Sequence, residues 1–139
     1  MDATSQEIDS AQAHLDFDPS CLTVVDEDGQ PACEIIPGTA FPQIMQNMAD
    51  NELGQISYAA GNLVPGTVLQ RPFILATMRF RAEDLTPRTD VVFHLERFRE
   101  TQANIGYTSV PIRVITDGQV RIYVYRLFMP LLVNGHNQN

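Results

Sequence analysis

The sequence predicts an all-β protein, an antiparallel sandwich of eight or nine short strands. Apolar residues recur with a period of two rather than 3.6, turn residues interrupt the chain at short intervals, and no segment has the pattern of a long helix. A chain of 139 residues suits one domain. It can bury a core of its own without a metal or a dense set of disulfides.

Strands in the first half are predicted mainly from alternation. Residues 11–17 place apolar side chains at every odd position, and 21–25 form a largely β-branched run. Residues 30–40 contain two prolines and a glycine and are expected to be mostly loop. Residues 41–48 fit either a helix or one side of a strand. Residues 55–60 alternate again after a turn.

The second half contains the clearest predicted strand, residues 72–82. Its shared apolar face consists of Ile74, Ala76, Met78 and Phe80. Residues 90–96 alternate as well, and further strands are expected over 101–109 and 112–116. Asp117–Gly118 is a hairpin signal, because glycine tolerates the positive φ of a tight turn. It leads into a last strand within 119–128.

Charge excludes several classes of function. The chain has 17 acidic and 9 basic residues and a net charge of −8, and every basic residue is arginine. This balance argues against nucleic-acid binding and against docking on anionic lipid. The absence of lysine excludes Schiff-base and P-loop lysines. No stretch reaches the roughly 18–20 apolar residues that insertion into a membrane requires.

Three segments, in order, resemble the strand motifs of cohesin-like domains. They are Leu15–Val25 (LDFDPSCLTVV), Gly54–Gly61 (GQISYAAG) and Ile74–Ala82 (ILATMRFRA). The resemblance covers about residues 8 to 125. It implies a nine-stranded jelly roll within residues 1–126, followed by an extra tail, 127–139. The family's members include the dockerin-binding modules of cellulosomes.

The resemblance also implies a function and a location. We expect a non-enzymatic extracellular or cell-surface module for protein–protein assembly or attachment, with a carbohydrate-binding module as the alternative. Residues 1–10 are polar and acidic and lack the pattern of an export signal, so a secreted form requires a longer precursor. The family's usual first strand, which would precede residues 2–10, is not apparent in this sequence. A fragment or a misassigned start would explain that equally well.

The tail is a candidate pairing strand. Residues 127–133 form the most apolar stretch of the chain, interrupted by Pro130. Unpaired sheet edges accept added strands. The tail is therefore predicted to cover its own domain or to join a second copy into a homo-oligomer or filament. The residues assigned to this contact are Leu127, Phe128, Met129, Leu131, Leu132 and Val133.

Cys21 and Cys33 are candidates for a disulfide that pins the loop between them to the second strand. The alternative is two unlinked small residues. Two cysteines do not make a four-ligand zinc site, and the three histidines stand at no recognisable ligand spacing.

Other candidate sites are weaker. Asp26 and Asp28 could offer oxygen ligands to Ca²⁺, although they lack the spacing of an EF-hand and a solvated turn is the better interpretation. Tyr58 and Tyr123 could stack on sugars in the carbohydrate-binding alternative. The pairs His14–Ser57 and His94–Glu96 suggest no catalysis, because no nucleophile elbow, zinc-binding helix or glycine-rich nucleotide loop occurs. No cofactor is expected.

Overall fold

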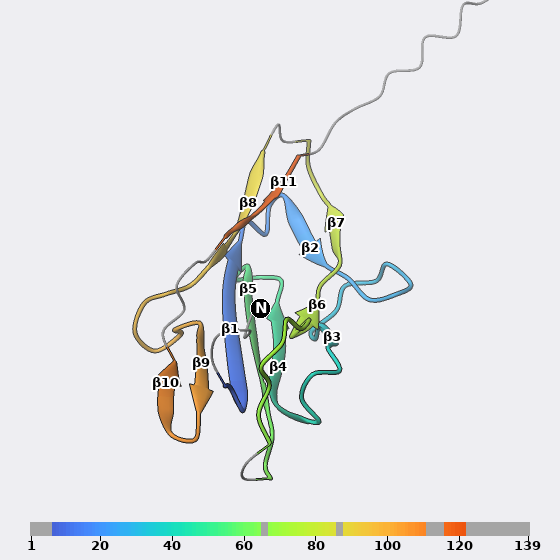
Figure 1. Ribbon diagram of the computed structural model, residues 1–139. Helices are drawn as coiled ribbons and strands as arrows, with labels where there is room; N and C mark the ends of the chain where they lie inside the picture. The colour runs from blue at the N-terminus through green and yellow to red at the C-terminus, as the bar shows by residue number, and fades with distance from the viewer. Residues whose placement is uncertain (1–6, 65–66, 86–87, 111–115, 122–139) are drawn as a thin grey trace, which may run out of the picture.

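The protein is a two-layered antiparallel β-sandwich (Figure 1). The computed structural model describes residues 7–64, 67–85, 88–110 and 116–121. These residues form eleven strands, arranged as one seven-stranded sheet and two two-stranded sheets, and contain no helix. The prediction of an antiparallel all-β sandwich is confirmed, with the strands cut into more pieces than expected.

The large sheet is built around β1 (Ser10–Phe17). On one side β1 pairs with β5 (Gln55–Gly61) from Ser10 to Asp16. On its other side two strands share its length: its first residues pair with β9 and its last with β8. The outer strands of the sheet are β4, β10 and β11. The other five strands of this sheet are β4 (Gln43–Asp50), β8 (Thr89–Phe93), β9 (Gln102–Ile105), β10 (Thr108–Val110) and β11 (Gly118–Val120).

The second layer is made of short paired segments. In it, β2 (Leu22–Val24) pairs with β7 (Phe80–Ala82), and β3 (Ile36–Pro37) pairs with β6 (Ala76–Thr77). Residues 72–82 are therefore not the single strand predicted, because the chain changes its partner between β6 and β7. Met78 and Phe80 keep the predicted alternation and pack against the core. Ile74 does not, since it lies before β6 and is 68% exposed.

Other boundaries also differ from the prediction. Residues 41–48 fit a helix or a strand, and the structure has residues 43–48 in strand β4, which continues to Asp50. Residues 101–109 divide into β9 and β10 at Gly106, whose φ of 57° allows the tight turn between them. The hairpin turn predicted at Asp117–Gly118 is wrong at Gly118, which has no positive φ but begins β11 and pairs with Val91 of β8. The predicted strand 112–116 and most of 119–128 lie outside the described residues.

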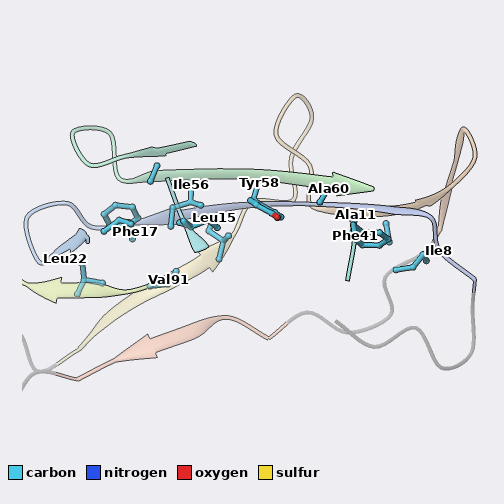
Figure 2. Packing of buried hydrophobic residues seen from close by; sticks show 14 residues of the cluster. Ile8, Ala11, Leu15, Phe17, Leu22, Phe41, Ile56, Tyr58, Ala60 and Val91 are labelled. Atoms are coloured by element: carbon cyan, nitrogen blue, oxygen red, sulfur yellow. The ribbon is translucent and has the colours of Figure 1, made fainter. Parts of the chain in front are cut away.

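The core lies between the two layers (Figure 2). Ile56 and Tyr58 contribute from β5, and Leu22 and Val24 contribute from β2; these are the largest fully buried side chains. Alternate residues of β1 point into the same core, with Leu15 4% exposed. This arrangement explains the period-two pattern of residues 11–17 and 55–60. It also defines which side chains of the large sheet face away from the core.

Candidate functional site

The candidate site is the face of the large sheet that points away from the second layer, here called the outer face. Side chains alternate across a sheet, so the residues between the core positions of β1 and β5 belong to this face. Strand register places Met48 beside Ser57, Ser57 beside His14, and Val92 beside Asp16. The outer face comprises Gln12, His14, Asp16, Met48, Ser57, Ala59, Val92 and His94.

A buried polar pair lies at the centre of the outer face. The His14 Nδ1 and the Ser57 Oγ are 2.9 Å apart, and these residues are 7% and 4% exposed. Thr101 fixes the backbone of His14, because its hydroxyl accepts from the His14 N–H and donates to the His14 carbonyl. Burial lowers the pKa of His14 below its ordinary value, and the positive charge of Arg99 lowers it further. Neutral His14 is therefore favoured in the folded protein.

Asp16 is the centre of a second, charged network. Its carboxylate accepts hydrogen bonds from Arg99 Nη1 at 2.6 Å and from His94 Nδ1 at 2.8 Å. Burial alone would raise the pKa of Asp16, but the hydrogen bonds from Arg99 and His94 outweigh it and hold the pKa below its usual value. Arg99 also donates to the Leu15 carbonyl at 3.2 Å. The network thus ties residue 99 to the central strand.

These contacts anchor a loop, residues 95–100, between β8 and β9. Backbone hydrogen bonds join the two ends of the loop to each other and to β1. The His94 N–H donates to the His14 carbonyl, and the Thr101 N–H donates to the His94 carbonyl. Gln12 Nε2 donates to the Glu100 carbonyl at 2.8 Å. In Figure 1 the loop lies on the side of β1 away from β2 and β7.

The loop and the sheet present apolar side chains to solvent. Phe98 is 93% exposed and has a φ of 80°, an uncommon conformation for a residue with a side chain. Met48 is 45% exposed and Val92 37% exposed. The β5 residues between them, Ser57 and Ala59, are small. The outer face therefore carries exposed apolar side chains around a buried polar network.

The arrangement does not favour catalysis. A nucleophile must reach its substrate, and the Ser57 hydroxyl is covered. His94 bonds to Asp16 rather than to Glu96, so the second pair considered from the sequence does not form. Among the residues with described positions, no three His, Cys, Asp or Glu side chains are grouped to hold a metal ion.

Tyr58 does not lie on a surface. It is 1% exposed and points into the core, so it cannot stack on a sugar (Figure 2). The expectation failed because β5 is buried on both faces, and alternation alone does not distinguish its two sides. The Tyr58 hydroxyl has no hydrogen-bond partner within the described structure. Tyr123, the second residue considered for sugar binding, lies outside the described residues, as does the predicted contact segment 127–133.

The structure has Cys21 and Cys33 as free cysteines, so the predicted disulfide is not formed in it. The two residues face different neighbours. The Cys21 carbonyl accepts from the Glu83 N–H beyond β7, whereas the Cys33 carbonyl accepts from the Ala49 N–H on β4. The Cys21 thiol instead contacts the Asp18 carboxylate, with Sγ and Oδ2 3.5 Å apart.

Asp26 organises a turn with its carboxylate. Its Oδ1 accepts from the backbone N–H groups of Asp28 and Gln30, at 3.0 and 2.9 Å. This is the pattern of an aspartate that holds its own loop. The sequence pattern therefore indicated a turn correctly, and the structure gives Asp26 a local role that needs no calcium ion.

No pattern in the sequence indicated Arg99, Thr101 or Phe98 as parts of the site. They come from a loop far from β1 in the chain, and no local pattern links them to Asp16 or His14. Asp16 was a weak signal of this site, because an acidic residue at an outward position of a central strand usually needs a charged or hydrogen-bonding partner.

The fold is cohesin-like. The structure superposes on the type II cohesin dyad from the adaptor scaffoldin ScaA of Acetivibrio cellulolyticus with a TM-score of 0.66 and 13% identity, over 86% of this chain and 41% of that one. A type II cohesin domain from the cellulosome of the same organism gives a TM-score of 0.66 and 13% identity, over 81% of this chain and 77% of that one. The chain thus spans about two-fifths of the dyad's length.

No protein-family model matches the sequence, and no curated protein sequence matches it. The likeness is therefore one of fold, and it agrees with the family resemblance of the three strand motifs. Within the described residues there is no helix long and apolar enough to cross a membrane.

Proposed function

We propose that this chain is a non-enzymatic module that binds a protein partner through the outer face of its large sheet, as part of an extracellular or cell-surface assembly. The observation that carries the proposal is the outer face itself. It combines the exposed apolar side chains of Met48 and Val92 with a fixed network of buried polar groups, and the loop anchored to that network exposes Phe98. Apolar and aromatic side chains are enriched at protein–protein interfaces, and binding costs less free energy when the side chains are held in place beforehand.

The comparisons support an assembly role. The two similar structures come from a scaffoldin and from a cellulosome, as their descriptions state. The carbohydrate-binding alternative has less support, because Tyr58 is buried. We therefore expect a protein rather than a glycan as the ligand, and an exported form of the chain.

The experiment compares the wild-type chain with an outer-face variant, Val92→Arg, and a matched control, Ile74→Arg. Both substitutions add a charge at an exposed apolar residue, but Ile74 lies beside the second layer. Each chain is immobilised and exposed to secreted proteins of the source organism, and retained proteins are identified by mass spectrometry. Each retained protein is then purified and titrated calorimetrically against all three chains.

We expect a specific partner whose affinity falls at least tenfold with Val92→Arg and stays unchanged with Ile74→Arg. A glycan array probed with the same three chains covers the alternative. Equal binding by all three chains, or retention by a glycan alone, would contradict the proposal.

A further inference from the structure

A second surface, distinct from the outer face, lies along the free edge of β4. In the described part of the chain β4 pairs with β5 alone. Its C-terminal half is covered, because the Ala49 N–H donates to the Cys33 carbonyl at 2.7 Å and the Asn47 side chain bonds to the backbone of Ile35. Its N-terminal half, 43–46, has no such cover among the described residues, and all of its residues are exposed.

This edge carries few of the features that normally prevent strand addition. Proteins protect their edges with charges, prolines and bulges. Residues 43–49 contain no charged side chain, and Ile44 and Met45 are 42% and 56% exposed. The protection consists of Pro42 just before the strand and a bulge between Ile44 and Gln46. A short added strand remains compatible with both.

We propose that the apolar segment Leu127–Val133 of a second copy of this chain adds to the free edge of β4. The segment LFMPLLV has no charge and matches the uncharged edge. Pro130 lacks an N–H, but an added strand is itself an edge strand, so its nitrogen can face away from β4.

The donor must be a second copy, because the segment cannot reach β4 of its own chain. Four strand spacings of about 4.8 Å separate β11 from β4 across the order β11–β8–β1–β5–β4. The two sites also lie at opposite ends of β1, since Gly118 is level with Phe17 whereas Gln43 is level with Ser10 (Figure 1). The combined separation is about 30 Å. The connecting residues 122–126 reach about 20 Å when fully extended.

The geometry also sets the kind of assembly. The donor segment follows one outer strand of the sheet, and the acceptor is the strand at its other side. Such a contact uses two different surfaces of the chain, so it either closes into a ring, of which a dimer with reciprocally exchanged tails is the smallest, or continues as an open filament. Main-chain hydrogen bonds supply the affinity, and the alternating side chains set the register.

The test measures self-association of the full chain by sedimentation over a range of concentrations. The acceptor variant is Ile44→Lys, the donor variant is Leu131→Asp, and the control is Ile74→Lys. Wild type and the control are expected to associate, while each of the other two variants weakens association at least tenfold. Mixing the donor and acceptor variants should restore heterodimers only, because one intact edge and one intact tail remain.

A synthetic peptide of residues 126–133 provides a readout that does not depend on assembly. It should bind wild type and compete with self-association, and it should not bind Ile44→Lys. A wild-type chain that stays monomeric at all concentrations, or association that neither variant weakens, would overturn the proposal. Val92→Arg changes the outer face and leaves the β4 edge intact, so it should self-associate like wild type. A failure of the strand-addition proposal can therefore be distinguished from a failure of the outer-face proposal.

Discussion

β1 and β4 are strands of equal length in the same sheet, eight residues each, yet their environments differ. β1 has neighbours on both sides and is buried or half-buried along its length. Among the described strands β4 has one neighbour, and its first four residues are exposed. Two strands of equal length therefore contribute differently when they differ in their number of partners. The central strand holds the fold and its polar networks, and the outer strand leaves surface free for binding.

The largest effect expected from this difference is on stability. Leu15→Ala on β1 removes a side chain that is 4% exposed and should lower the free energy of unfolding by about 2–5 kcal/mol. Met45→Ala on β4, 56% exposed, should change it by less than about 0.5 kcal/mol. Urea denaturation followed by circular dichroism measures both. Similar losses from the two substitutions would mean that β4 is not a free edge in solution.

The next effect concerns the charged network on β1. Asp16→Asn weakens the contacts to Arg99 and His94 and should cost about 1–2 kcal/mol at neutral pH, since the carboxylate is partly exposed. The folded pKa of Asp16 lies below its unfolded value of 3.8, so its stabilisation is present above that pH and is lost as pH falls through the folded pKa.

His14 adds a separate step at higher pH. Its folded pKa is lowered by burial first, so its contribution is complete above the unfolded value of 6.5 and declines as pH falls below it. Unfolding measured from pH 8 to pH 3 should therefore show two declines in wild type. The lower decline should be smaller in Asp16→Asn, where the lowered pKa values of Asp18, Glu83 and Asp90 still contribute. An unchanged acid profile in Asp16→Asn would show that the carboxylate is not paired in solution.

The smallest effect has the opposite sign. Tyr58 lies on β5 between the two strands compared here, paired with Ala13 on one side and Asn47 on the other. Its buried hydroxyl has no partner in the described structure, so Tyr58→Phe should raise the free energy of unfolding by about 1 kcal/mol. Thermal unfolding by calorimetry measures this change. A loss of stability would reveal a hydrogen bond that the hydroxyl makes in solution.

Alternation identified the strands that have one face in the core. It succeeded for residues 11–17 because one face of β1 packs inward along the whole strand, and it placed Leu15 and Phe17 in the core correctly. It was wrong about the continuity of 72–82, because a change of partner strand leaves the alternation of Met78 and Phe80 intact. Strand breaks are set by pairing, and pairing depends on residues distant in sequence.

The candidate site was less predictable than the fold. His14 and Ser57 could be considered together from the sequence, and the structure places them in contact. Tyr58 was considered for sugar stacking because the sequence around it does not show which faces of its strand are covered by other elements. The contacts of Arg99 with Asp16 join residues from opposite halves of the chain. No spacing rule reports such a contact.

The hydrogen bonds that close the base of loop 95–100 have a consequence for how this surface can diversify. His94 and Thr101, the residues that flank the loop, both hydrogen-bond to His14 of β1, so the pairing beside β1 continues across the base of the loop. The entropic cost of closing a loop grows slowly with its length. Insertions or deletions between these two positions that keep Arg99 and its bond to Asp16 can therefore be accepted without shifting the strand register. The loop is thus a practical point for grafting foreign peptides.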